Sequence, residues 1–231
     1  MHFEKLQIIN EYERLMDSEV VKAVTAVQKQ IRRDFSRFWH VGNPTLEIVD
    51  GPHKLNHKLP WVVILDNTDH AGALGYHDMT KEHMPVGKVF AGSDQRYGMN
   101  WNVTFSHEIL ELLADPQINR VVEGPNHHMY AVEVCDACED DSYAYDIDGT
   151  KVSDFVTPAW FGMDKSTTYD FQKHIHKPFE LLRGGYIGVF KDGHWTQVTD
   201  QKNFTIKARP PVGSRRERRM AGVEQWLVST R

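Results

Sequence analysis

The sequence is poor in cysteine and has no long apolar run. Two cysteines among 231 residues cannot build a disulfide framework. No apolar run approaches the roughly 18 residues of a membrane helix, and the N-terminal stretch MHFEKLQIIN carries charges where a secretion signal would be apolar. The net charge of −5 argues against a general nucleic-acid binder. We therefore expect a cytoplasmic protein, or a virion-associated one if the chain is phage-derived, with neither a membrane nor a nucleic acid as partner.

Short motifs of several enzyme classes are also missing. The sequence has no glycine-rich phosphate loop, no serine nucleophile elbow and no dinucleotide fingerprint. Hydrophobic residues make up 40% and aromatic residues 11%, which is typical of a folded globular protein. The length fits one large domain, with or without an appended arm.

The order of apolar patterns predicts an α+β fold. A long helix is expected over residues 17–38, capped by Asp17 or Ser18. Strands are expected at 45–49, 61–66, 71–77 and 88–91, the third of them at the edge of a small mixed sheet, and at 129–134. Hairpins are expected around Asp148-Gly149 and Asp192-Gly193 in the C-terminal half. The apolar stripe of the long helix is Val20, Val21, Val24, Val27 and Ile31.

A second helix is expected from Trp101 to Asp115, where Pro116 ends it. His107, Glu111 and Asp115 recur every four residues and share one face of this helix. Acids and a histidine in an otherwise apolar helix are costly to bury unless a cation compensates them, so we predict a divalent metal site. The apolar side of the helix is Phe105, Ile109, Leu110, Leu112 and Leu113.

The nearest mechanistic template for this helix is the zincin motif H-E-x-x-H. Two ligands one turn apart bind zinc there, and the glutamate after the first acts as general base on the bound water. Here Glu111 replaces the second histidine, which gives H-E-I-L-E. Asp115, at the unfavourable end of the helix dipole, is expected either to have Arg120 or the metal as cationic partner or to cap a turn.

A second acidic segment, A-V-E-V-C-D-A-C-E, follows at residues 131–139. Together the two segments resemble a zincin-like group of bacterial and phage proteins. They are also similar to the plant exordium (phosphate-induced) proteins, in which an H-E-L-x-E helix precedes an E-I-x-D-x-C segment. The resemblance covers residues 100–140 and, more loosely, VSDFVTPAWF. It implies a zincin-like fold: a backing helix, a small sheet, the metal helix and a hairpin-rich C-terminal half. The matching positions are His107, Glu108, Glu111, Pro116, Glu133, Asp136 and Cys138.

We assign His107 and Glu111 as metal ligands, with the third ligand from the second segment. Asp136 is the first choice and Glu133 the second, because positions 133 and 136 of a strand face opposite sides unless the chain turns between them. Glu133 is alternatively a hydrogen-bond partner of His107. Glu108 is the candidate general base. In the competing interpretation, these acids pair with arginines on a polar surface, namely Arg96 and Arg120.

This ligand set predicts a zinc-dependent hydrolase of the zincin type, acting on peptide or amide bonds. One imidazole and two carboxylates neutralise the metal charge, so hydrolysis is expected to be slow or shifted to alkaline pH. Oxygen-rich coordination also admits manganese, iron or calcium. The alternative is a non-catalytic structural or interaction protein, for example of a phage-like assembly, in which the metal is a staple.

Two further features have open interpretations. Cys135 and Cys138 form one C-x-x-C pair, interpreted as buried thiols, as a local disulfide, or as half of a zinc site. Residues 208–231 form a proline-containing linker and a basic amphipathic tail after a domain at 1–207. The tail is expected to join a homo-oligomer or an assembly partner, to dock on an acidic surface or on nucleic acid, to pack on its own domain, or to be solvated. The histidines that could complete a cysteine–zinc site are His127, His128, His174 and His176.

Overall fold

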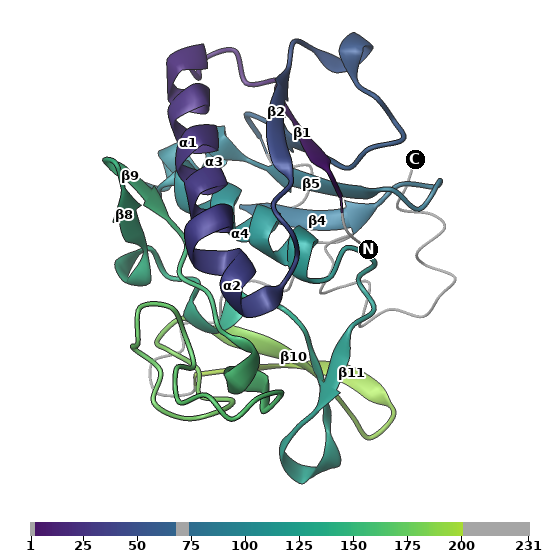
Figure 1. Cartoon of the computed structure of the whole chain (residues 1–231), viewed down its shortest axis with the longest axis vertical. Helices are drawn as coiled ribbons and strands as arrows, with labels where there is room; N and C mark the ends of the chain where they lie inside the picture. The colour runs from purple at the N-terminus through teal and green to yellow at the C-terminus, as the bar shows by residue number, and fades with distance from the viewer. Residues whose placement is uncertain (1–2, 68–73, 201–231) are drawn as a thin grey trace.

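The computed structural model describes residues 3–67 and 74–200. The predicted tail and the first residues of the predicted edge strand lie outside this part of the chain. The described residues form a mixed α+β structure with one five-stranded sheet, one four-stranded sheet and a small hairpin (Figure 1). Within them, no helix has the length and apolar character needed to cross a membrane.

The five-stranded sheet has the order β2-β1-β3-β5-β4. The first four strands are parallel, and β4 runs antiparallel to β5 at the edge. The interior strand β1 is not among the predicted strands, which is a correction: Leu6 and Ile8 of the charged N-terminal stretch are fully buried. The strand bounds are β1 Lys5–Asn10, β2 Thr45–Val49, β3 Trp61–Ile64, β4 Gly75–Met79 and β5 Pro85–Val89.

The long N-terminal helix is confirmed, in three consecutive pieces. They are α1 (Asp17–Lys29), a π-helical turn (Gln30–Phe35) and α2 (Ser36–Trp39). The predicted caps, Asp17 or Ser18, are wrong. The N-cap residue of α1 is Met16, whose backbone N–H donates to Glu19 Oε2 at 3.1 Å.

The predicted apolar stripe of this helix is correct except at one position. Val20, Val24, Val27 and Ile31 are buried, but Val21 is 50% exposed and faces away from the sheet. Since α1 packs against both β2 and β9, the helix joins the five-stranded sheet to the later part of the chain.

The predicted second helix is confirmed as α4 (Trp101–Ala114), after the short α3 (Ala91–Arg96). It packs against β5 and the edge strand β4, and also against β9. Its predicted apolar residues are all buried, and Phe105, Ile109 and Leu110 belong to the same core cluster as Leu6 and Ile8. Because α4 is enclosed on nearly all sides, its polar residues are held in the interior.

The C-terminal half is rich in hairpins, as predicted. The pairs β8–β9 and β10–β11 turn at Asp148-Gly149 and Asp192-Gly193, where both residues of each turn have positive φ. The predicted strand at 129–134 is shorter, since β7 ends at Ala131. The four-stranded antiparallel sheet has the order β11-β10-β7-β6. The bounds are β6 Val121–Glu123, β7 Met129–Ala131, β8 Tyr145–Ile147, β9 Thr150–Val152, β10 Tyr186–Lys191 and β11 His194–Thr199.

Candidate metal centre

Helix α4 supplies the first half of the candidate centre. His107 and Glu111 are one helical turn apart, and Glu108 follows His107 directly. All three residues are at most 9% exposed. The helix therefore holds an imidazole and two carboxyl groups out of bulk water, where they need compensating partners.

The second acidic segment supplies the other half. After β7 ends at Ala131 the chain leaves the sheet, and a 3₁₀ turn begins at Asp136. The chain therefore turns between positions 133 and 136 instead of continuing as a strand, and Glu133 and Asp136 both approach Glu111 of α4. The backbone N–H of Cys135 donates to Glu111 Oε1 at 3.2 Å, and this bond ties the carboxylate of Glu111 to the second acidic segment.

Three of the predicted metal ligands converge on one point. His107 Nε2 lies 3.4 Å from Glu111 Oε2 and 3.3 Å from Asp136 Oδ1. Bonds of about 2.1 Å to a tetrahedral ion place neighbouring ligand atoms about 3.4 Å apart. The donor set and its spacing therefore fit a divalent metal ion held by His107, Glu111 and Asp136.

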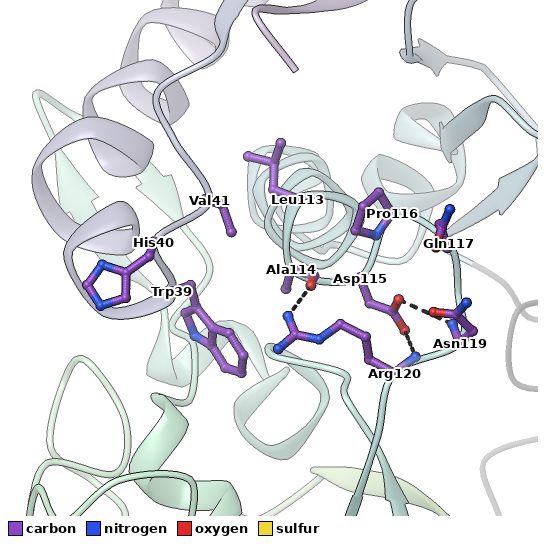
Figure 2. Close-up of a pocket in the computed structure, with 10 residues that line it drawn as sticks. All are labelled: Trp39, His40, Val41, Leu113, Ala114, Asp115, Pro116, Gln117, Asn119 and Arg120. Atoms are coloured by element: carbon purple, nitrogen blue, oxygen red, sulfur yellow. Dashed lines mark hydrogen bonds between the residues drawn. The ribbon is translucent and has the colours of Figure 1, made fainter. Parts of the chain in front are cut away.

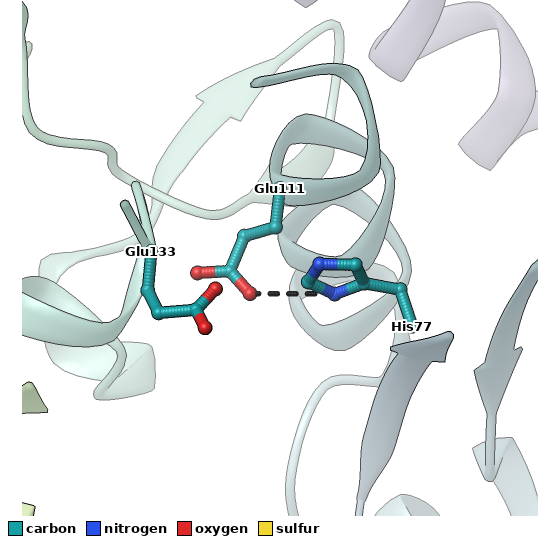
Figure 3. Close-up of side chains that lie close together, drawn as sticks. All are labelled: His77, Glu111 and Glu133. Atoms are coloured by element: carbon teal, nitrogen blue, oxygen red, sulfur yellow. Dashed lines mark ion pairs between the residues drawn. The ribbon is translucent and has the colours of Figure 1, made fainter. Parts of the chain in front are cut away.

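Glu133, the other candidate ligand, belongs to an adjoining cluster with Glu111 and His77 (Figure 3). His77 comes from the edge strand β4, and its Nδ1 lies 3.6 Å from Glu111 Oε2 and 3.2 Å from Glu108 Oε2. Glu111 is thus shared by both clusters. Glu133 offers a carboxylate oxygen to the second cluster, whose three ligand atoms all lie within 4.8 Å of one another.

His77 is the site residue that sequence reasoning missed. It falls at the end of the predicted edge strand, and strand alternation puts it on the same face as Gly75. A Cβ on Gly75 would lie 2.7 Å from Glu108 Oε1, so this face of β4 is the one against α4. A histidine on an edge strand preceding the metal helix was the available signal.

The acids and histidines of the centre influence one another strongly. Burial raises the pKa of Glu108 well above its ordinary value, and the charges of Glu111, Asp136 and Glu133 raise it further, against the opposing effect of His107. Burial lowers the pKa of His107, but Glu111 and Asp136 outweigh it and the net shift is upward. The centre therefore favours added positive charge, whether protons or a metal ion.

The alternative in which arginines neutralise these acids does not fit the contacts of the two arginines. Arg96 Nη1 donates to Asp66 Oδ1 at 2.8 Å. Arg120 Nη1 donates to the carbonyl of Ala114 at 2.6 Å, and its guanidinium lies 5.7 Å from the ring centre of Trp39. Both side chains are engaged away from the candidate centre.

Asp115 is a turn cap rather than a metal ligand. Its carboxylate accepts the backbone N–H groups of Asn119 at 3.2 Å and Arg120 at 2.8 Å. It lines a pocket of about 210 Å³ beyond the end of α4, together with Trp39 and Arg120 (Figure 2). Among the described residues it belongs to none of the His/Cys/Asp/Glu groups spaced for a metal.

The two cysteines are free and buried, so the local disulfide is not formed. Burial raises the pKa of both thiols well above the ordinary value. Within the described part of the chain, neither thiol joins a metal-spaced group. Of the histidines considered for a cysteine–zinc site, His174 instead approaches Asp154 and Asp170.

The arrangement can hold a metal beside a buried carboxyl group, and the geometry alone supports this. Comparison of the chain with protein-family models, curated proteins and solved structures found no match.

Proposed function

We propose that the protein is a zincin-like, metal-dependent hydrolase that acts on peptide or amide bonds. The observation that carries the proposal is the convergence of His107, Glu111 and Asp136 beside Glu108. Zinc is the expected ion, with manganese, iron or calcium as alternatives for an oxygen-rich set. An antiparallel edge strand beside the metal helix agrees with the zincin-like order expected from the sequence.

In this proposal the bound metal supplies Lewis acidity for the substrate carbonyl and the attacking water. Glu108 accepts a proton from the water and delivers it to the leaving amine. His77 Nδ1, 3.2 Å from Glu108 Oε2, holds that carboxylate in place.

A peptide is the preferred substrate class because β4 ends the described sheet next to α4. An extended peptide can add to such an edge through backbone hydrogen bonds, which would bring its carbonyl groups alongside the helix.

The burial of the centre favours the second candidate function, a structural staple. The side chains of His107, Glu111 and Asp136 are only 11%, 5% and 8% exposed. A closed metal site contributes to folding without binding a substrate. In that case the same residues bind the metal, but Glu108 has no role in turnover.

Hydrolysis of an unstructured polypeptide by the zinc-loaded full chain separates these functions. We expect the wild type to cleave it and Glu108→Gln to lose about 10²- to 10⁴-fold in rate while keeping its zinc. Glu82→Gln, an exposed acid in the β4–β5 turn, is the matched control. Full turnover by Glu108→Gln would exclude the proposed base, and a zinc-loaded wild type that cleaves nothing would favour the staple.

A further inference from the structure

A second group of metal-type donors lies away from α4. Asp154 follows strand β9, and Asp170 forms an isolated β-bridge with Val156. His174 Nδ1 lies 3.6 Å from Asp154 Oδ2 and 3.6 Å from Asp170 Oδ2. One imidazole nitrogen is thus equidistant from two carboxylate oxygens, at a separation too long for hydrogen bonds.

Backbone groups orient both carboxylates. Asp154 Oδ1 accepts the N–H groups of Phe155 at 2.8 Å and Gln172 at 3.2 Å. Asp170 accepts those of His174 at 2.8 Å and Ile175 at 2.9 Å. Carboxylates that ligate metals are held in this way by outer hydrogen bonds.

The remaining oxygen of Asp154 is the decisive feature. Oδ2 is buried and accepts no hydrogen bond from a donor group of the described residues. Asp154 and Asp170 are both 0% exposed, so bulk water does not solvate this oxygen. Two such acids in contact need either a shared proton or a cation between them. Burial and the neighbouring Asp170 raise the pKa of Asp154, so a proton can join the two acids, but only a common ion would bind the imidazole of His174 as well.

We propose that Asp154, Asp170 and His174 form a second divalent-cation site, structural in role and independent of the proposed function. The separations of 3.6 Å are close to the roughly 3.4 Å expected around a tetrahedral ion with bonds of about 2.1 Å. An imidazole beside two carboxylates favours zinc or a similar transition metal over magnesium. The His174 side chain is 42% exposed, which leaves an entry path for the ion.

This site would staple the part of the chain that has little regular structure. Between β9 and β10, the described chain has one 3₁₀ turn (Pro158–Phe161) and the single Val156–Asp170 bridge. An ion joining Asp154 to Asp170 and His174 closes the loop that contains this turn. Phe155 and Phe171, the neighbours of the two acids, stack at 5.2 Å and pack the same junction.

Zinc stoichiometry of the full chain tests the site. Metal-free protein is titrated with Zn²⁺, and the zinc retained after gel filtration is measured by elemental analysis. We expect His174→Ala to retain one zinc fewer than the wild type. His176→Ala, an exposed histidine two residues further on, is the control and should match the wild type.

Glu111→Gln separates this site from the α4 centre. In that background the remaining zinc should be lost on adding His174→Ala, and chelator should lower the melting temperature only while His174 is present. Failure of the α4 centre would lower the wild-type count but leave the His174-dependent zinc unchanged. Equal zinc in wild type and His174→Ala would overturn the proposal, as would a melting temperature of Glu111→Gln that chelator leaves unchanged.

Discussion

His77 Nδ1 lies 3.2 Å from Glu108 Oε2, and this contact joins the edge strand β4 to the helix α4. The same nitrogen is 3.6 Å from Glu111 Oε2. One imidazole therefore touches both the proposed base and a proposed ligand from a separate element. The position of Glu108 depends on β4 as well as on its own helix.

Replacing His77 should affect turnover more than metal content. His77→Asn removes the partner of Glu108 but leaves His107, Glu111 and Asp136 in place, so we expect one zinc at this centre and a rate lower by about 10- to 100-fold. Zinc content and hydrolysis rate measured on the same sample check this. His83→Asn, in the exposed β4–β5 turn, is the control. Loss of zinc from His77→Asn alone would instead make His77 a ligand.

The two acids of the second segment should differ as ligands. Asp136 Oδ1 lies 3.3 Å from His107 Nε2, whereas Glu133 groups with His77. Asp136→Asn is therefore expected to lower zinc affinity by more than Glu133→Gln, for which a loss of about 10- to 100-fold is typical of an outer partner. Competition with a chromophoric chelator measures both affinities. The reverse order would place the ion at the His77 cluster.

Removing the metal should destabilise the protein more at alkaline than at acid pH. The pKa of Glu108 and that of His107 are both raised, so the metal-free fold holds protons that the unfolded chain releases. Its stability therefore falls as pH rises above about 4.5 and on through neutrality. Metal binding instead strengthens as the ligands deprotonate.

The difference in melting temperature with and without chelator should accordingly widen from pH 5.5 to pH 8. Thermal unfolding of one preparation at both pH values measures it. Glu111→Gln, which lacks a shared ligand, should show a smaller widening. A difference that is constant or larger at pH 5.5 would contradict the assignment of these buried groups to a metal.

Local signals in the sequence were sufficient for several elements. Pro116 correctly ends α4 after Ala114, and both Asp-Gly pairs form the predicted tight turns. A parallel strand covered on both faces is expected to be a continuous apolar run. The strand β1 was missed because the polar Gln7 interrupts its run, although Gln7 is buried too and hydrogen-bonds the backbone of Asn56. Burial on both faces follows from its interior place in the sheet, and that place is a property of the whole fold.

The site was predictable only where its residues share a helix. His107 and Glu111 follow from helical spacing, but His77 meets Glu108 across 31 positions of sequence. Glu133 and Asp136 approach α4 together because β7 stops at Ala131, and the composition of this segment does not signal that stop. Long-range packing therefore decides which acids surround the ion.

The close approach of β4 to Glu108 can be tested at Gly75. A Cβ at this position would lie 2.7 Å from Glu108 Oε1 and 2.8 Å from Thr104 Cγ2, both closer than normal contacts. Gly75→Ala should therefore displace Glu108 or the edge strand. A shift of about 1 Å at a reacting group can lower a rate by about 100-fold, so we expect turnover to fall by at least about tenfold.

Zinc content should remain near that of the wild type, because the three atoms nearest to a Cβ on Gly75 belong to Glu108 and Thr104 and not to His107, Glu111 or Asp136. Gly188→Ala is the matched control. Gly188 lies in the four-stranded sheet, where an added Cβ would make an ordinary 3.4 Å contact with Ala131 of the same sheet. Hydrolysis rate and zinc content of the two variants are compared side by side. A Gly75→Ala protein with unchanged turnover would show that Glu108 does not need its place against β4, and the role of the edge strand in the proposed mechanism would fall with it.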